Sequence, residues 1–287
     1  MEKKKIIVTG ANGQLGKELQ EVVRAGALPY EFIFFSREEF SIQDPEEVAR
    51  VFSEVRPDYC INCAAYTAVD KAETEKELAF AVNGEAVSLL AAACRNIGAR
   101  LIHISTDYVF DGHSAIPLKE SDSTGPINIY GASKLKGEQL ALQENKETLI
   151  IRTSWVYSEF GNNFVKTMMR LMREKEKINV VDDQIGSPTY AADLAGVILQ
   201  IVTGGKFIPG IYHYSNEGQI SWFDFALAIK ESTLSTCIVS PIHTAQYPTP
   251  AQRPHYSLLD KDLIRKTYGI SIPGWRESLA ICIARLS

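Results

Sequence analysis

The sequence of 287 residues has no long hydrophobic run, and nothing in it approaches the ~20 consecutive apolar residues that a membrane-spanning helix needs. The apolar run at residues 6–8 stops at Thr9, too early for the hydrophobic core of a signal peptide. We therefore expect no membrane contact and a cytoplasmic location. An excess of positive charge is also missing. The 30 Lys and Arg against 35 Asp and Glu give a net charge of −5, so no nucleic-acid partner is expected.

Cysteine is scarce, and the five cysteines suggest neither a disulfide framework nor a metal site. Their odd number argues against a set of disulfides in a cytoplasmic chain. Cys60 and Cys63 have C-x-x-C spacing, but they lie in an apolar run that predicts a strand, where residues three apart face opposite sides. The five histidines are scattered without zinc-ligand spacing, so these residues predict no metal site.

Apolar runs alternate with helical periodicity through the first half of the chain. The runs predict strands over residues 4–9, 31–36, 59–63, 101–105 and 148–153. Helices are expected over residues 14–24, from residue 44 onward, and over 72–82, 86–96 and 129–145. Continuous apolar strands separated by helices indicate an α/β protein whose parallel sheet is covered on both faces.

The pattern becomes less regular after about residue 155. Helices are expected over residues 164–176, 194–202, 222–231, 260–268 and 275–285, with short apolar pieces at 211–214 and 237–239. Three methionines at 168, 169 and 172 are expected to fill the core. We expect one large sheet domain with a smaller, mixed C-terminal lobe packed on its edge.

A glycine-rich segment at residues 9–16 lies between the first predicted strand and the first predicted helix. Its glycines permit a tight turn and a close backbone approach, while N–H groups at the helix start face a pyrophosphate. The segment therefore predicts a dinucleotide site, with a purely structural turn as the alternative. The residues expected to contact the dinucleotide are Gly10, Asn12, Gly13, Gln14, Leu15 and Gly16.

The end of the second predicted strand should read the adenosine ribose, because it lies about twenty residues after the glycine turn. Ser36 and Arg37 suit the 2′-phosphate of NADP, since a guanidinium forms charge-assisted hydrogen bonds with phosphate. Glu38 and Glu39 could instead bind the 2′-hydroxyl of NAD, because an acid at the strand end accepts a hydrogen bond from that group. The sequence thus favours NADPH and leaves NADH as the alternative.

Tyr130 and Lys134 lie one helical turn apart at the start of a predicted helix, so they share a face. A phenol has an ordinary pKa near 10, and an adjacent ammonium together with a positively charged nicotinamide is expected to lower it by ~3 units. The pair is then suited to act as a general acid on a carbonyl. The spacing alone is common by chance.

A hydroxyl at the end of the predicted strand 101–105 is placed to orient such a carbonyl, because open α/β sheets bind ligands at the carboxyl ends of their strands. Ser105 and Thr106 occupy this position and point to opposite faces. Only one of the two hydroxyls can serve, and their spacing leaves open which.

Taken together, these motifs resemble the extended branch of the short-chain dehydrogenase/reductase superfamily. Segments at residues 62–73, 105–110, 152–157, 161–164 and 248–254 resemble one of its families, the dTDP-4-dehydrorhamnose reductases. The resemblance implies a Rossmann-like doubly wound parallel sheet, with residues 1–155 mainly binding NADP and residues 156–287 mainly binding a sugar nucleotide. It implies NADPH-dependent reduction of the 4-keto group of dTDP-4-dehydro-L-rhamnose to give dTDP-L-rhamnose.

The resemblance also implies a role for each matching residue. Thr106 would orient the keto group, Tyr130 would protonate the developing alkoxide, and Lys134 would tune Tyr130 and hold the nicotinamide ribose. The residues expected beside the cofactor are Asn62, Cys63, Ala64, Ala65 and Tyr66. The residues expected at the substrate are Val69, Thr106, Asp107, Tyr108, Trp155, Asn163 and Arg253. For Arg253, neutralising a diphosphate and forming a structural salt bridge both stay open.

The sequence departs from the family pattern at a metal site. Some members are described with Mg²⁺ held by glutamates at a dimer interface, and Glu18 fits one such position. Asp193 and the acid-free end of the chain do not supply the others. The sequence therefore predicts no Mg²⁺ of this kind, and it leaves a homodimer open.

Three other functions compete with keto reduction. A sugar-nucleotide dehydratase would need a second carboxylate after Asp107, where this chain has Tyr108. An epimerase would need a further acid–base pair near the sugar, for which His113 is the only candidate. A non-catalytic NADP-binding regulatory subunit would not need the complete set of reacting groups. A reductase of another nucleotide-keto sugar also stays open.

Overall fold

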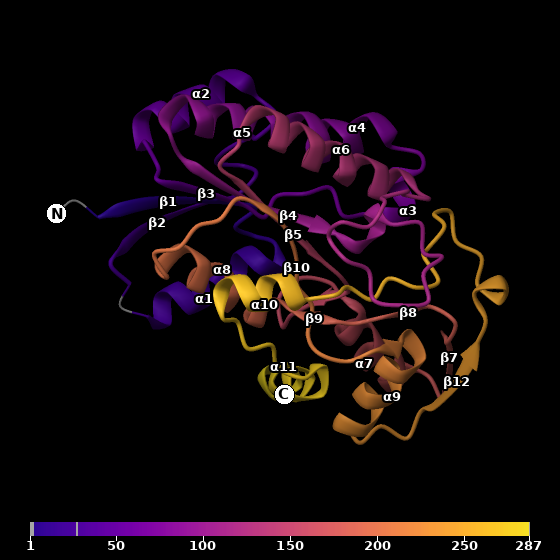
Figure 1. Cartoon of the computed structure of the whole chain (residues 1–287). Coiled ribbons are helices and arrows are strands. Elements are labelled where there is room, and N and C mark those ends of the chain that lie inside the picture. The colour runs from indigo at the N-terminus through magenta and orange to yellow at the C-terminus, as the bar shows by residue number, and fades with distance from the viewer. Residues whose placement is uncertain (1–2, 27, 287) are drawn as a thin grey trace.

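The computed structural model describes residues 3–26 and 28–286. Its centre is a six-stranded sheet in the order β10-β5-β4-β3-β1-β2, and all five neighbouring pairs are parallel (Figure 1). The strands are β1 (Lys4–Thr9), β2 (Tyr30–Phe35), β3 (Tyr59–Asn62), β4 (Arg100–Thr106), β5 (Thr148–Thr153) and β10 (Gly210–His213). This confirms the predicted doubly wound α/β fold. The edge strand β10 comes from the second half of the chain.

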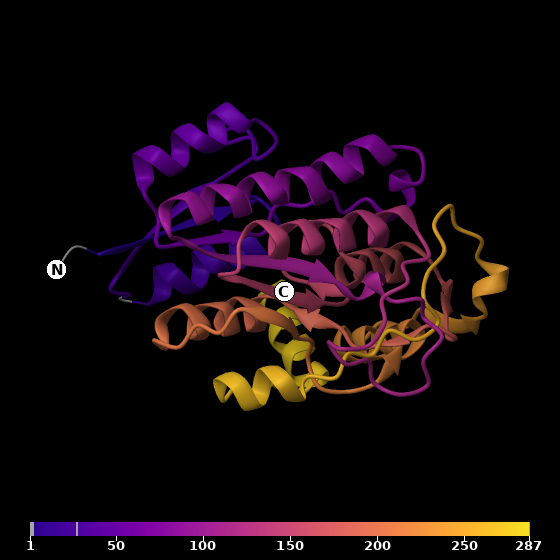
Figure 2. The same ribbon diagram turned by 45° about the horizontal axis from the view of Figure 1, so that its top comes forward.

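Helices cover both faces of the sheet, as Figures 1 and 2 show. One layer contains α2 (Pro45–Val55), α5 (Ala86–Ile97) and α6 (Ile129–Glu144), and the other contains α1 (Gln14–Ala25), α8 (Ala191–Thr203) and α10 (Asp262–Tyr268). Successive residues of β1 point to opposite layers: Ile7 packs in the core under α2 and α5, whereas Ile6 and Val8 pack in the core with α1 and α8. Burial on both faces explains why the strands are apolar without alternation.

The region after β3 differs from the sequence prediction of two helices over 72–82 and 86–96. The chain forms a short α3 (Val69–Ala72) and then a continuous helical run of α4 (Lys76–Phe80), the π-helical segment η1 (Ala81–Glu85) and α5. This run of 22 residues is long and apolar enough to cross a membrane by those two criteria alone. It packs against α2 and α6 like a core helix of a globular protein, which passes the same test.

The second half of the chain builds a further hydrophobic core below the carboxyl ends of the sheet. It includes α7 (Phe164–Glu174), α9 (Trp222–Ser232) and α11 (Trp275–Leu286), together with the parallel pair β7 (Lys177–Val181) and β12 (Ile238–Ile242). Met168 and Met172 are buried there, as expected for core filler. Two small sheets pair β6 (Val156–Tyr157) with β9 (Thr189–Tyr190), and β8 (Ile185–Gly186) with β11 (Ile220–Ser221).

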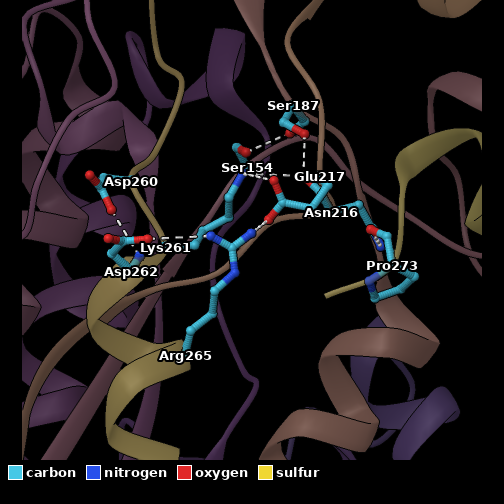
Figure 3. Close-up of polar contacts among 9 residues, drawn as sticks. All are labelled: Ser154, Ser187, Asn216, Glu217, Asp260, Lys261, Asp262, Arg265 and Pro273. Carbon is cyan, nitrogen blue, oxygen red and sulfur yellow. Dashed lines mark hydrogen bonds and ion pairs between the residues drawn. The ribbon is translucent and has the colours of Figure 1, made fainter. Parts of the chain in front are cut away.

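A buried polar network, called the seam network below, joins these segments around Asn216, which is fully buried (Figure 3). The backbone carbonyl of Asn216 accepts a hydrogen bond from Ser187 Oγ at 2.6 Å, and the carbonyl of Ser187 accepts one from Ser154 Oγ at 2.6 Å. The side-chain amide of Asn216 donates to Asp193 Oδ2 at 2.6 Å and to Ser278 Oγ at 2.9 Å. Pairing of this kind lets polar groups be buried without a large desolvation penalty.

Candidate active site

A cavity of about 620 Å³ opens at the carboxyl ends of β3, β4 and β5, the edge at which open α/β sheets bind ligands. It brings together thirteen residues that the sequence or the resemblance named as candidates. These are Gly13, Gln14, Leu15, Cys63, Ala65, Val69, Ser105, Thr106, Asp107, Tyr108, Tyr130, Lys134 and Trp155.

A second cavity of about 540 Å³ adjoins the first, because Gly13, Cys63, Ala65 and Thr67 line both. Its other predicted residues are Gly10, Asn12, Arg37, Ala64 and Tyr66. The two cavities together form one elongated groove across the sheet edge. A dinucleotide has this shape, with one half at the reacting groups and the other at Arg37.

The glycine turn leaves no room for side chains. Gly10 has φ +71°, and a Cβ there would lie 2.6 Å from the backbone nitrogen of Ala64. A Cβ on Gly16 would lie 2.3 Å from the carbonyl oxygen of Gly10, so Gly16 lets α1 pack on the turn without lining either cavity. Gly13 caps α1 without a side-chain hydrogen bond, which leaves the first N–H groups of this helix facing the groove. The turn therefore fits a pyrophosphate.

The four residues expected at the adenosine ribose, at the end of β2, differ in whether they reach the second cavity. Arg37 and Glu38 line the second cavity. Ser36 is buried, and its N–H donates to Glu39 Oε2 at 2.8 Å, which lowers the pKa of Glu39. Glu39 is thus bound to the backbone, and the cationic side chains that line this cavity are those of Arg37 and Lys71.

The hydroxyl groups of Ser105 and Thr106 have separate partners, which resolves the choice left open by the sequence. Ser105 Oγ donates to Glu138 Oε1 at 2.5 Å, inside the protein. Thr106 Oγ1 lies beside the phenol of Tyr130, accepts a hydrogen bond from the Tyr108 N–H and donates to Asp107 Oδ1 at 3.1 Å. Both residues line the cavity, but the Ser105 hydroxyl is bound to Glu138, so Thr106 is the hydroxyl that lies next to Tyr130.

Tyr130 occupies the first turn of α6, which begins where Asn128 Oδ1 accepts a hydrogen bond from the N–H of Gly131 at 2.8 Å. Burial raises the pKa of Tyr130 to about 12, the hydrogen bond with Thr106 lowers it, and the charge of Asp107 raises it. Lys134 therefore does not lower the pKa of Tyr130 in this structure, which corrects that part of the expectation. The contribution expected from a positively charged nicotinamide stays a prediction. Desolvation outweighs the ammonium because Lys134 points elsewhere.

Lys134 is buried and lines the cavity. Its Nζ donates to the carbonyl oxygen of Ile104 at 2.6 Å and lies 3.3 Å from Nε2 of His103. Burial lowers the pKa of Lys134 to about 8, against the opposing charge of Glu138. Lys134 can therefore change its protonation near neutral pH.

Trp155 has a strained backbone and a stacked neighbour that sequence reasoning missed. Its φ is +48°, a left-handed conformation that costs ~1–3 kcal/mol for a residue with a side chain. Its ring stacks on Trp222 with centroids 3.7 Å apart, and both rings line the cavity. A Cβ on Gly186 would lie 2.9 Å from Trp155 Cζ2, so Gly186 leaves space for the ring. Trp222 was predicted only as a helix start.

Two expected substrate residues are not among those lining either cavity. Asn163 caps α7 and donates from Nδ2 to Gln14 Oε1 at 2.9 Å, while its neighbour Asn162 lines the larger cavity. Arg253 forms a salt bridge with Asp70 at 2.8 Å. The structural salt bridge is thus the interaction that Arg253 makes in this structure.

Two buried asparagines support the loop that follows β3. Oδ1 of Asn62 accepts hydrogen bonds from Thr9 Oγ1 and from the N–H of Ala64. Asn83, in the π-helical segment, pairs with both backbone groups of Tyr66 at 2.8 and 3.0 Å. Sequence reasoning missed Asn83, although a polar residue inside an apolar helix was a usable signal.

The surroundings of Glu18 do not fit a Mg²⁺ ion. Glu18 is buried, accepts a hydrogen bond from Ser158 Oγ at 2.6 Å, and has its pKa raised by burial to about 7. The guanidinium of Arg285 pairs with Glu159 at 2.9 Å and lies 3.9 Å from Glu18. The cationic group beside Glu18 is thus the guanidinium of Arg285. Asp193, the other acid considered for the metal, is bound to Asn216 in the seam network.

Comparison with known proteins gives a consistent result. Residues 4–287 match the family described as the RmlD substrate binding domain. The chain is 42% identical to a dTDP-4-dehydrorhamnose reductase of Burkholderia thailandensis, over 98% of this chain and 99% of the relative. It is 38% identical to that of Escherichia coli K12, over 94% of each chain. A solved dTDP-4-dehydrorhamnose reductase of Bacillus anthracis in complex with NADP superposes with a TM-score of 0.95 at 42% identity, covering 99% of this chain and 100% of that one.

Proposed function

The chain belongs to the RmlD substrate binding domain family, and we propose that it reduces the 4-keto group of dTDP-4-dehydro-L-rhamnose with NADPH to form dTDP-L-rhamnose, a precursor of cell-surface polysaccharide. It is an oxidoreductase whose bound NADPH supplies the hydride. The observation that carries the proposal is one groove in which Thr106, Tyr130 and Lys134 stand beside a glycine turn suited to a dinucleotide. The NADP complex of the Bacillus anthracis relative supports this cofactor.

We assign the cofactor contacts to the residues of this groove. Arg37 would neutralise the 2′-phosphate, with Ser36 beside it, and Lys134 would hold the nicotinamide ribose. Glu38 lines the same cavity, so NADH stays the alternative. The pyrophosphate would lie on Gly10, Asn12, Gly13, Gln14, Leu15 and Gly16, and the strand-end segment beside the cofactor is Asn62, Cys63, Ala64, Ala65 and Tyr66.

Tyr130 is the proton donor in this proposal. Its raised pKa, about 12, keeps the phenol protonated throughout the neutral range, so an acid is present at every turnover. Thr106 would turn its hydroxyl proton from Asp107 Oδ1 to the keto oxygen and stabilise the negative charge that develops there. The proton of Tyr130 then passes to that oxygen and forms the alcohol.

The sugar would lie against Val69, Asp107, Tyr108 and Trp155, which line the cavity. An indole face packs well on the C–H groups of a sugar, and Trp222 holds the indole in place. Asn163 acts through Gln14, and Arg253 would have to leave Asp70 to reach a diphosphate.

The division of the chain follows from these assignments. Residues 1–155 form mainly the NADP-binding part and residues 156–287 mainly the sugar-nucleotide part. Strand β10, from the second part, pairs with β5 of the first, so the two parts share one sheet. The five free cysteines agree with a reducing cytoplasm, and a homodimer stays open.

The decisive test is NADPH oxidation, followed by absorbance, with the dTDP-linked and the GDP-linked 4-keto sugar, and with NADH in place of NADPH. We expect turnover with NADPH and the dTDP sugar. Cofactor binding without turnover would favour a non-catalytic regulatory subunit. Faster turnover of the GDP-linked sugar would show a reductase of another nucleotide sugar.

A further inference from the structure

Three buried polar residues form a row across the centre of the sheet. Thr9, Asn62 and His103 are neighbours in register on β1, β3 and β4, and none is more than 1% exposed. They lie two residues beyond Ile7, Cys60 and Leu101, so they share the face covered by α6. The row ends at Lys134, which reaches down from α6. We call Thr9, Asn62, His103 and Lys134 the sheet row.

The hydrogen bonds of the sheet row have a fixed direction. The backbone N–H of Ala64 can only donate, and it lies 3.1 Å from Oδ1 of Asn62. The NH₂ group of Asn62 therefore faces His103, with Nδ2 at 3.0 Å from Nδ1. Because an amide NH₂ only donates, Nδ1 of His103 carries no proton. Burial lowers the pKa of His103 well below its ordinary value, so the ring is neutral and its single proton is on Nε2.

That Nε2–H points at Lys134 Nζ, 3.3 Å away. An uncharged amine accepts a hydrogen bond at this position, whereas an ammonium offers only donors. The other titratable groups near Lys134 are Tyr130 and Glu138 on its own helix and Cys63 after β3. Glu138 is already held by Arg152 at 2.7 and 2.9 Å, and burial raises the pKa of Cys63, which keeps this thiol uncharged. His103 is thus the group in direct contact with Nζ that distinguishes the two forms of Lys134.

We propose that His103 is a positioning residue for Lys134: it presents its Nε2–H to the amine and thereby favours the uncharged form of Lys134 over the ammonium. The role of Lys134 at the cofactor rests on the proposed function, but the state of the His103 ring does not. Burial lowers the pKa of Lys134, and the contact with His103 favours loss of the same proton, so the proton affinity of Lys134 depends on Asn62 two side chains away.

A second buried histidine provides an internal reference. Nδ1 of His213 lies 3.0 Å from the carbonyl oxygen of Leu118, which only accepts, so Nδ1 of His213 carries the proton. Burial lowers the pKa of His213 to about 3, so this ring is also neutral. The two rings should therefore hold opposite tautomers in the same protein.

The direct test is long-range ¹H–¹⁵N correlation spectroscopy of the full chain labelled with ¹⁵N-histidine, with signals assigned through His103→Leu and His213→Leu. We expect a protonated Nε2 in His103 and a protonated Nδ1 in His213, both unchanged from pH 6 to 9. Protonation of His103 on Nδ1, or a charged His103 ring, would overturn the proposal. The measurement needs no substrate, so a failure of keto reduction leaves it independent.

Reversing the direction of the row tests its effect on Lys134. Asn62→Asp replaces the NH₂ group by an acceptor, so His103 should carry its proton on Nδ1 and offer a bare Nε2 to the ammonium. We expect the fall in kcat/KM above pH about 8 to move upward by ~1 pH unit, a tenfold change in proton affinity. Asn145→Asp, a buried asparagine outside the site, should leave the profile unchanged.

The double variant Asn62→Asp, His103→Leu separates contact from charge. If His103 transmits the effect of Asn62→Asp to Lys134, the upward shift disappears when His103 is removed. The pH at which kcat/KM falls in the double variant should then lie within ~0.3 pH units of its value in His103→Leu alone. If the upward shift persists without the imidazole, the new carboxylate acts on Lys134 through space, and the proposed role of His103 is wrong.

Discussion

The sheet row and the seam network are both buried, but they differ in how their donors and acceptors are paired. In the seam network, Asn216 Oδ1 accepts the N–H of Tyr190 at 2.7 Å, and its NH₂ group finds Asp193 and Ser278 (Figure 3 shows the adjoining backbone contacts). The sheet row instead ends with a donor, Nε2–H of His103, facing a group that is an acceptor in only one of its two protonation states. A fully paired network stabilises one structure. In the sheet row, Lys134 at the end can gain or lose a proton.

The two regions also meet different parts of the groove. The sheet row lies under Tyr130 and the expected nicotinamide site. The seam network reaches Trp155 through Ser154, which precedes it in the chain, and through Gly186, which packs against its ring. Ser154 Oγ donates to the carbonyl oxygen of Ser187, the residue after Gly186. The strained backbone of Trp155 is therefore held from below by paired polar groups. Variants in the first region should change rates, and variants in the second should change stability and substrate affinity.

The largest effect on rate is expected for Tyr130→Phe, which removes the donated proton and keeps the ring. A positioned general acid contributes ~10²–10⁴-fold, so kcat should fall by about that factor. The free energy of unfolding and the Kd for NADPH should change little, as measured by denaturant titration and by binding of the cofactor. A variant that keeps wild-type kcat would remove Tyr130 from the role of acid.

The largest effect on stability is expected for Asn216→Ala. It leaves the buried N–H of Tyr190 and the carboxylate of Asp193 short of partners, and each unsatisfied group costs ~1–3 kcal/mol. The free energy of unfolding should fall by ~3 kcal/mol or more in a urea titration. Asn96→Ala, at an exposed position on α5, serves as the matched control and should change it by less than ~0.5 kcal/mol. Equal losses in the two variants would contradict the structural role of the seam network.

Local sequence predicted most strands of the main sheet and several residues of the candidate site, but not the tertiary contacts that distinguish the two networks. Apolar runs predicted the five strands of the first half, and the spacing of Tyr130 and Lys134 predicted their shared helix face. These signals are local and periodic, so a sequence carries them directly. The boundaries around α3 and α4 were missed because the π-helical segment joins two helices without a break.

The contacts that tertiary structure creates could not be read in advance. His103 and Trp222 each look like ordinary strand or helix residues until the fold brings them to Lys134 and Trp155. The direction of the pKa shift of Tyr130 depends on burial and on where Nζ of Lys134 points, and neither follows from spacing. The register of three parallel strands is what creates the sheet row.

A smaller effect is expected where the seam network meets the cavity. Gly186→Ala places a methyl group 2.9 Å from Trp155 Cζ2, so the indole must shift while the fold persists. We expect the KM for the sugar nucleotide to rise about tenfold, equivalent to ~1.4 kcal/mol of binding, with kcat changed less than threefold. Gly196→Ala, on α8, adds a Cβ that would meet nothing within 4 Å, and this variant should leave KM unchanged. An unchanged KM in both variants would show that the position of Trp155 does not set substrate affinity.

The smallest effect is expected at Asp70, outside both networks, where the salt bridge with Arg253 is partly exposed. Asp70→Asn should lower the free energy of unfolding by less than ~1 kcal/mol, the usual contribution of such pairs. The pKa of Asp70 is lowered by the hydrogen bond from Arg253, so the contribution is present above the unfolded pKa, ~3.9, and is lost as pH falls through the folded value. The difference between wild type and variant in denaturant titrations should therefore shrink toward pH 3. The same variant frees the guanidinium, so a lower KM for the sugar nucleotide would identify Arg253 as a diphosphate ligand, whereas an unchanged KM would leave it a structural residue.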